Sequence, residues 1–452
     1  MKNEQRYIKS QTMLLTAMLL AATLLTACGT DSTTTEVPEQ SVPITLTAAV
    51  DGGITRSGAT GTIDYSVLAS SGYGFGVFSK IETAVTDWTD WQNEPVTYNG
   101  PTPAENPGTV FAYPGSWIYN GGTFRYWKEH ANDKAIDLFA YAPYVSTASL
   151  TTPGITAIGD TTDDPTVTYT IATEPQHGVD LLWGVNGSTG LPWTGATLAA
   201  TGGPVLFTFR HALAAIGIHV QAMIDKQNDK DDLTDKSEVA NLLGAGGDYK
   251  LTIKKVELTG KTADDKFYEQ GTLHLKNTTK NTPLWKDGKQ AEKTLTVPNA
   301  QIVASMRHPF ADNVYTADAT DETKAKAIMT GAISGVTQEP QQLLIAPHAN
   351  GKEQLFFVIP NATAQSYQLK LYWCVSGKTT SDPYYVAEDR ETTIDLGTLT
   401  FVAGVKYYLN LVIGLHTINL NVTAEDWQGE PVNISEIIEH GTSASESLSR
   451  RR

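Results

Sequence analysis

The sequence predicts an all-β protein built from two domains. Of its 452 residues, 38 are Gly and 21 are Pro, while charged residues make up 18%, a composition typical of short strands joined by turns. Several segments alternate apolar and polar residues with a period of two, which is the spacing of a strand with one buried face. A chain of this length is long enough for two domains that each bury a core of their own.

The first 27 residues carry the features of a lipoprotein signal peptide. Three basic residues, Lys2, Arg6 and Lys9, precede an apolar run over residues 13–25. This run is shorter than a typical transmembrane helix. Small residues stand directly before Cys28, as at a signal-peptidase site. We therefore expect residues 1–27 to be removed, and Cys28 to become a lipidated N-terminus that anchors the chain through a polar tether.

A strand is predicted directly after the tether, within residues 41–56. Its apolar side chains alternate along the chain, so the strand would have one buried face. These side chains are Ile44, Leu46, Ala48 and Val50. Asp51 and two glycines then form a turn signal that ends the strand.

This first strand is interpreted as one that proteolysis can remove. Arg56 stands among small residues that are open to a trypsin-like protease, and it is the only Lys or Arg between Ser32 and Tyr73. Cleavage between Arg56 and Ser57 would separate the strand and its anchor, residues 28–56, from everything downstream. The alternative is an ordinary first strand followed by a loop.

The first predicted domain covers residues 57–203. Its strands are expected at residues 73–81, 123–127, 135–143, 166–171 and 179–184. The Pro- and Gly-rich stretch over residues 92–114 is predicted to be a loop. The domain boundary is placed in the loop that ends at Pro204.

The second predicted domain covers residues 204–427. It opens with the apolar segment 205–220, and further strands are expected at residues 249–258, 294–297, 342–346, 354–359, 366–375 and 406–413. Short helical insertions are predicted at residues 233–243, within a charged surface excursion, and at residues 321–329. Cys374 is expected to be a core residue of a strand.

Two segments near the C-terminus repeat the pattern of the first strand. Residues 417–424 place Ile418, Leu420 and Val422 on one face, at the spacing found in the first strand. Residues 431–438 place Val432 and Ile434 on one face. Either segment could fill the place of the first strand, and the sequence leaves the choice open. The Ser- and Arg-rich tail is predicted to be disordered.

The side chains suited to catalysis or metal binding form no clear set. His177 and Asp180 could form an acid-base pair, but their neighbours indicate a turn that enters a strand, and His211 is interpreted as a core or interface histidine. The sequence has no zinc-ligand spacing and no phosphate-binding glycine motif, so we expect no enzyme activity, metal or cofactor. The net charge of −16 argues against nucleic acid as a partner.

Aromatic side chains are the main candidates for ligand binding. Tryptophans in or beside the predicted loops are Trp88, Trp91, Trp117 and Trp193. They could stack on sugars or host proteins, but packing beneath a long loop is the interpretation that we favour.

Together these segments resemble the fimbrillin family, the lipoprotein pilins of type V pili on Gram-negative anaerobes. The resemblance covers most of the mature chain and depends on the order of several short motifs, none of them diagnostic alone. They are the lipobox at Cys28, Thr55-Arg56-Ser57 after a strand, Tyr126-Trp127 followed by LFAYAPY at residues 138–144, FRHALAAI at residues 209–216, YYLNL at residues 407–411, and INLNV at residues 418–422 ending at Asp426-Trp427.

The resemblance implies two tandem transthyretin-like β-sandwich domains and a place on the cell surface. It implies export to the outer membrane as a lipoprotein, with Cys28 as the lipidated residue. It also implies removal of the first strand by an Arg-specific surface protease after Arg56, and head-to-tail polymerisation with other pilin subunits by donor-strand exchange. Family members often have Ala after that Arg, and Ser57 is also small. Residues 428–452 correspond to the donor-strand extension and tail.

An alternative role is that of a pilus tip adhesin, or of a surface lipoprotein that never polymerises and binds glycans, host proteins or bacterial surface ligands. A tip subunit needs a site that accepts a strand but no strand to donate. Residues 428–438 look able to donate, which favours a stalk subunit.

Overall fold

Strands dominate the computed structural model, so the predicted all-β fold class is confirmed. The structure describes residues 42–51, 62–70, 72–81, 89–100, 116–127, 134–159, 163–222, 248–291, 293–297, 301–307, 343–344, 355–361, 363–377, 385–386, 390–413, 418–427 and 438–439. The helices among them are single turns: α2 (Tyr65–Leu68), α3 (Leu198–Thr201), η1 (Asn120–Gly122) and η2 (Pro175–His177). The helices predicted at residues 233–243 and 321–329 lie outside the described residues.

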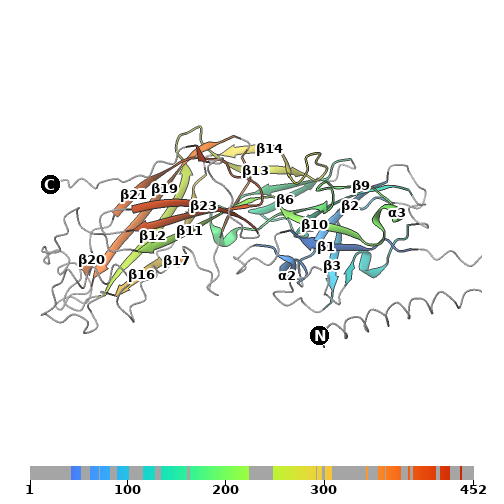
Figure 1. The fold of residues 1–452 in the computed structure, drawn as a ribbon, viewed down its shortest axis with the longest axis horizontal. Helices are drawn as coiled ribbons and strands as arrows, with labels where there is room; N and C mark the ends of the chain where they lie inside the picture. The colour runs from blue at the N-terminus through green and yellow to red at the C-terminus, as the bar shows by residue number, and fades with distance from the viewer. Residues whose placement is uncertain are drawn as a thin grey trace, which may run out of the picture. The chain divides into compact units, whose positions relative to one another are not determined.

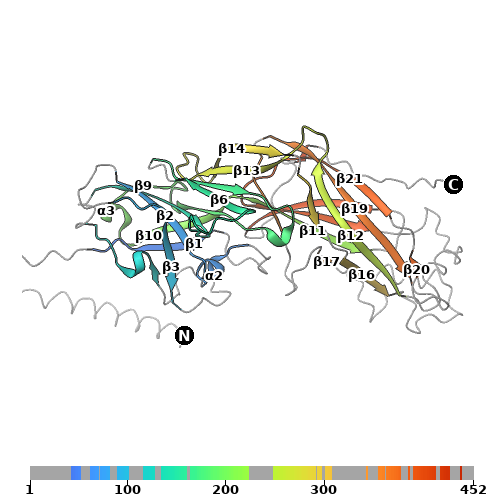
Figure 2. The same cartoon turned by 180° about the vertical axis from the view of Figure 1, so that it is seen from behind.

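The first sheet contains the predicted removable strand at one edge. Its members are β1 (Leu46–Val50), β2 (Phe75–Ile81), β3 (Glu94–Asn99), β4 (Ser116–Ile118), β5 (Ile136–Ala142), β8 (Leu182–Asn186), β9 (Trp193–Ala196) and β10 (Val205–His211). The strand order is β1-β10-β8-β5-β2-β3-β4, with β9 beside β5. β1 runs parallel to β10, and both views of the molecule show the two side by side (Figures 1 and 2).

β3 corrects one prediction from the sequence. It lies within residues 92–114, so the loop predicted there is wrong over Glu94–Asn99. Pro95 and Asn99 suggest a loop, yet Val96 between them is fully buried and anchors the strand in the core. A proline is tolerated near the start of a short peripheral strand because few ladder hydrogen bonds are lost there.

The central strands of the first sheet are buried on both faces. Every residue of β5 is buried except Asp137, and β2 is similarly covered. Phe75 and Leu138 join the hydrophobic cluster that contains β1, whereas Phe78 and Phe139 join a second cluster on the other face. Strands enclosed in this way carry continuous apolar runs instead of a strict alternation, which explains the sequences of β2 and β5.

The second sheet has the order β14-β13-β7-β6. Its members are β6 (Gly154–Gly159), β7 (Thr166–Thr170), β13 (Phe267–His274) and β14 (Leu284–Ala291). β7 and β13 pair antiparallel, although they lie on opposite sides of the boundary predicted at Pro204. The two halves of the chain therefore share one sheet.

The third sheet has the order β17-β11-β22-β23, with β18 beside β11. Its members are β11 (Ala214–Ala222), β17 (Leu343–Leu344), β18 (Phe356–Val358), β22 (Val405–Ile413) and β23 (Ile418–Asp426). β11 and β22 run parallel, and β23 follows antiparallel at the edge. The apolar segment predicted over residues 205–220 is thus two strands in different sheets, β10 and β11.

The fourth sheet has the order β15-β12-β19-β21-β24, with β16 beside β12 and β20 beside β19. Its members are β12 (Asp248–Gly260), β15 (Leu295–Val297), β16 (Gln301–Arg307), β19 (Gln365–Gly377), β20 (Tyr385–Val386), β21 (Arg390–Leu399) and β24 (Ile438–Glu439). Cys374 lies within β19. β24 pairs with β21 through Leu399 and Ile438, so part of the C-terminal extension adds to this sheet.

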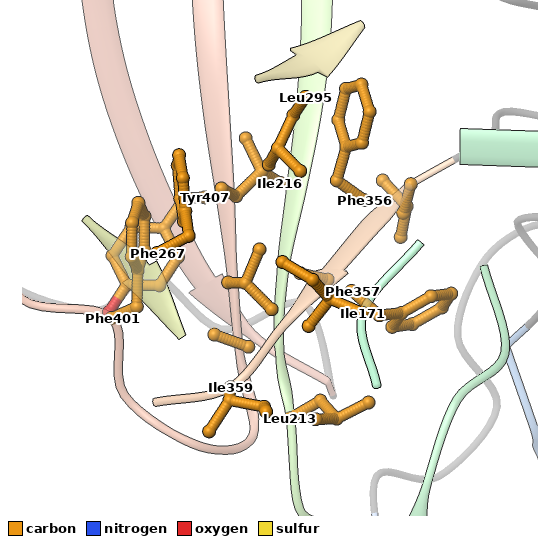
Figure 3. Close-up of a cluster of buried hydrophobic side chains, with 14 of the residues drawn as sticks. Ile171, Leu213, Ile216, Phe267, Leu295, Phe356, Phe357, Ile359, Phe401 and Tyr407 are labelled. Atoms are coloured by element: carbon orange, nitrogen blue, oxygen red, sulfur yellow. The ribbon is translucent and has the colours of Figure 1, made fainter. Parts of the chain in front are cut away.

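The larger core contains side chains from all four sheets and is rich in aromatic rings. Figure 3 shows part of it, with Phe356 and Phe357 of β18 beside Ile216 of β11. On the other side of this group, Phe401 packs against Tyr407 at a centroid distance of 5.2 Å. Aromatic rings supply much of the apolar contact area in such cores.

Candidate functional site

The candidate site is the place that residues 43–51 occupy beside β10, which we call the β1 site. β1 pairs with β10 in parallel register, from Leu46 opposite Val205 to Val50 opposite Phe209. The ladder continues past the strand, because the Asp51 N–H donates to the carbonyl oxygen of Phe209 at 2.7 Å. A short segment of backbone is thus bound along one side by a complete row of hydrogen bonds.

The start of the segment is also held from its other side, by residues 125–127. The Ile44 N–H donates to the carbonyl oxygen of Arg125 at 2.7 Å, and the Trp127 N–H donates to that of Val42 at 2.9 Å. The Tyr119 hydroxyl donates to the Ile44 carbonyl oxygen at 2.7 Å. Burial raises the pKa of Tyr119 to about 12, so this hydroxyl remains a donor at neutral pH.

The side chains of the segment alternate between the core and the outer surface. Ile44 is fully buried and Leu46 and Ala48 are 3% exposed, whereas Val50 is only partly buried. The buried side chains belong to the same cluster as Phe75, Phe207, Phe209 and Trp117, whose rings contact one another. Burial of Ile44 and Leu46 stabilises the folded chain by about 1.5 to 3 kcal/mol each.

Neighbouring residues of β10 hold the chain on both sides of the predicted cleavage site. Before it, the Asp51 carboxylate pairs with the Arg210 guanidinium, at 2.7 Å between Oδ2 and Nη1. After it, the Ile63 N–H donates to Asp180 Oδ2 at 3.2 Å, and the same oxygen lies 2.7 Å from Nδ1 of His211. Residues 52–61, with Arg56 and Ser57, lie outside the described residues, as does Cys28.

The sequence did not predict the contact between Asp180 and His211. A pair of His177 with Asp180 was considered there, and a turn that enters a strand was favoured instead. Nε2 of His177 instead lies 3.9 Å from Oε2 of Glu174. Asp180 is fully buried, in contact with His211. The His211 ring stacks on Trp427 at a centroid distance of 3.6 Å. The alternation in β10 places His211 in the buried row with Phe207 and Phe209, which signals a need for a polar partner but does not identify it.

The C-terminal candidates for a donor strand lie in different settings. Ile418, Leu420 and Val422 are partly buried side chains of β23 that pack against the larger core. β23 pairs with β22 over its full length, from Ile418 to Asp426. Val432 and Ile434 lie outside the described residues.

Two of the tryptophans considered for ligand binding are core residues. Trp91 and Trp117 are 3% and 4% exposed, so the packing interpretation is correct for both. Trp193 is partly buried, and its indole N–H donates to the carbonyl oxygen of Leu206 at 2.8 Å. Trp88 lies outside the described residues.

Within the described part of the chain, no three His, Cys, Asp or Glu side chains converge as metal ligands would. Over the same residues, none of the helices has the length and apolar character needed to cross a membrane.

The family model described as fimbrillin-like matches residues 69–316, which is more than half of the chain. The chain therefore belongs to the fimbrillin-like family, and the family inferred from the sequence is confirmed. A search of curated proteins finds no match.

Solved structures that align with this chain come from species of Bacteroides. A fimbrial protein from Bacteroides vulgatus aligns over 85% of this chain and 99% of its own, with 16% identity and a TM-score of 0.49. A protein proposed to act in cell adhesion, from Bacteroides uniformis, aligns over 85% of this chain and 98% of its own, with 16% identity and a TM-score of 0.37. A third structure is that of a protein from Bacteroides ovatus, also proposed to act in cell adhesion. It aligns over 86% of this chain and 98% of its own, with 14% identity and a TM-score of 0.35.

Proposed function

We propose that this chain is a structural subunit of a cell-surface pilus, exported as an outer-membrane lipoprotein with Cys28 as its anchor. An Arg-specific surface protease cuts between Arg56 and Ser57, and the removed strand is replaced by the donor strand of another copy. The observation that carries the proposal is β1 itself. It is a terminal edge strand whose side chains enter the core, and Arg56 follows its last residue, Val50, within six residues.

In the intact chain, β1 fills its site intramolecularly. Its covalent link gives it a high effective concentration, so a strand from another molecule competes poorly. Cleavage removes that advantage, and once β1 leaves, β10 has an unpaired backbone edge beside exposed apolar side chains. An extended segment with alternating apolar residues restores both the hydrogen bonds and the burial.

The same exchange produces a filament. The site that accepts a strand lies in the first half of the chain, while the strand to be donated lies at its C-terminal end, so each contact joins two different surfaces. Contacts of this type do not close on themselves in a pair of molecules, and they extend head to tail.

We propose residues 431–438 as the donor in preference to residues 417–424. The full ladder between β23 and β22, together with the stacking of Trp427 on His211, supports a structural role for the segment that contains Ile418, Leu420 and Val422. Withdrawal of β23 would break that ladder and expose Ala424 and Trp427, both buried. Residues 431–438 follow Trp427, so their withdrawal would leave the ladder of β23 in place. Of these residues the structure describes Ile438, which would give up its pairing with Leu399 of β21.

A substitution pair tests this choice. Ile434→Asp places a charge on the proposed donor and should abolish assembly, while the free energy of unfolding of the uncut chain stays nearly the same. Val422→Asp, in β23, should instead lower the free energy of unfolding, because a charge is placed against the core. Assembly that survives Ile434→Asp would rule out residues 431–438 as the donor.

The experiment that tests the whole proposal starts from the chain beginning at Gly29. Treatment with an Arg-specific protease should create a new N-terminus at Ser57, followed by SDS-resistant ladders and a rise in light scattering. Arg56→Ala should abolish both events, and truncation after Trp427 should abolish the ladders alone. A chain that is cut at Arg56 and remains a stable monomer would overturn the stalk role, in favour of a tip adhesin or a surface lipoprotein that binds a ligand.

A further inference from the structure

The ion pair at the end of β1 joins the removable strand to the strand that remains. Asp51 Oδ2 lies 2.7 Å from Arg210 Nη1, and the two side chains are 30% and 27% exposed. Both point to the outer side of the sheet, opposite to Phe209, which is fully buried in the core. The pair therefore closes the ladder without taking part in the apolar packing.

Removal of β1 would leave Arg210 without this partner. Among the described residues, Asp51 supplies the carboxylate that lies within ion-pair distance of Arg210. The Nε atom of Arg210 is buried and has no hydrogen-bond partner in this part of the structure. A half-buried guanidinium without a carboxylate is unfavourable, so a strand that brings one is preferred over a strand that does not.

The C-terminal segment carries a carboxylate at the matching position. In the first strand, Asp51 stands seven residues after Ile44, which follows Pro43. In the segment after Trp427, Glu439 stands seven residues after Val432, which follows Pro431. In this register Ile434 and Ile438 take the places of Leu46 and Val50, and Glu439 takes that of Asp51.

We infer that Arg210 is a specificity-determining residue of the β1 site, which pairs with Asp51 before cleavage and with Glu439 of a second copy after exchange. This inference rests on the proposed function. The pair fixes the register of the incoming strand, since a shift of one residue would turn its apolar side chains away from the core.

The same register gives Glu436 the opposite effect. It falls at the position of Ala48, which is 3% exposed in the core. A carboxylate there is unfavourable, so Glu436 weakens the strand that Glu439 strengthens. Replacing either Glu removes one negative charge, which makes the two substitutions matched controls for each other.

The test uses the chain from Gly29 and measures the rate of assembly after cleavage, by light scattering. R210E and E439R should each slow assembly by about fivefold, and the double variant R210E/E439R should restore most of the rate. E439A should also slow assembly, whereas E436A should accelerate it.

The uncut chain supplies a second readout, which separates the two partners of Arg210. R210E should lower the midpoint of thermal unfolding before cleavage. The double variant R210E/D51R should restore this midpoint, whereas R210E/E439R should not. After cleavage the roles of the two substitutions are exchanged. E439R should then restore the rate of assembly of the R210E variant, and D51R should not.

The outcomes distinguish this inference from the proposal on which it rests. If the unmodified chain fails to assemble after cleavage at Arg56, donor-strand exchange and the role of Arg210 both fail. If it assembles, and R210E/E439R is no faster than either single variant, the role of Arg210 is overturned while donor-strand exchange stands.

Discussion

At the scale of single residues, Tyr119 shows how one side chain holds the removable strand. Its hydroxyl donates to the Ile44 carbonyl oxygen and accepts a hydrogen bond from the Arg125 N–H, at 2.7 and 3.0 Å. It therefore joins the start of the segment to the backbone on its other side. The loss of this hydroxyl leaves a buried carbonyl oxygen with one donor fewer.

We expect Tyr119→Phe to lower the free energy of unfolding of the uncut chain by about 1 kcal/mol, and to accelerate release of the strand once Arg56 is cut. Tyr98→Phe is the matched control, because the Tyr98 hydroxyl is buried and has no partner in the described structure. Its removal should be neutral or stabilising. Denaturant unfolding and mass spectrometry of the released peptide give the two readouts, and equal effects of both variants would contradict the role of Tyr119.

Tyr119 also predicts a loss of stability at alkaline pH. Burial raises its pKa in the folded chain to about 12, from the ordinary value of about 10 that it regains on unfolding. The folded state thus holds the proton more tightly, and this stabilisation is complete below about pH 10 and is lost as the pH rises towards about 12. Tyr119→Phe should therefore show a shallower fall in thermal midpoint over this range than the unmodified chain.

Residues of the site differ in how well a sequence reveals them. The alternation of Ile44, Leu46 and Ala48 follows directly from the period of a strand, and each of these side chains is buried in the structure. The partner of His211 does not follow, because Asp180 lies in another strand region and only the sheet order brings them together. A period of two identifies which side chains point inward, but it carries no information about what they meet.

At the scale of elements, β1 is unusual because a core strand is expected to be temporary. Leu46→Ala should lower the free energy of unfolding of the uncut chain by about 2 to 5 kcal/mol, because it leaves a cavity among aromatic rings. The cleaved and exchanged product should be unaffected, since residue 46 is no longer part of it.

Thr47→Ala is the control for this prediction, because Thr47 lies on the outer side of the same strand. It should change the free energy of unfolding of the uncut chain by less than about 0.5 kcal/mol. Denaturant unfolding before and after exchange provides the measurement. A lower stability of the exchanged product from Leu46→Ala would show that the strand had not been replaced.

Elements with one buried face were the most predictable from the sequence. β1 and β23 show clear alternation, and both lie at sheet edges. The break between β10 and β11 was missed, because Ala212 and Leu213 are as apolar as the strands they join and are fully buried. The chain passes there from one sheet to another without a polar turn, which a search for turn residues does not detect.

At the scale of the whole molecule, the two predicted sandwiches are linked through the second sheet. β7 pairs with β13 from Thr166 opposite His274 to Thr170 opposite Gln270. Val167 and Leu273 lie opposite each other in this ladder, and both are fully buried. The division into two transthyretin-like domains at Pro204 stays a prediction, and so does the independence of the two halves.

We expect the halves to unfold together because of this shared ladder. Hydrogen exchange followed by mass spectrometry should give the same denaturant midpoint for β5, in the first sheet, and β19, in the fourth. Val167→Asp, which places a charge in the ladder, should lower both midpoints by the same amount. Separate midpoints, or a change confined to β5, would contradict the coupling.

The shared ladder has a consequence for a subunit under tension. If a pull enters through the β1 site and leaves through the C-terminal end, it can cross between the halves along the covalent chain at Ala212 and Leu213. Among the described residues it can also cross through the hydrogen-bonded ladder of β7 and β13 and through the stacking of Trp427 on His211. Because unfolding of either half would remove its strands from the sheet that the halves share, neither half should yield before the other. A single-molecule pull on one subunit would then show one extension step, whereas two successive steps would show that the halves bear load independently.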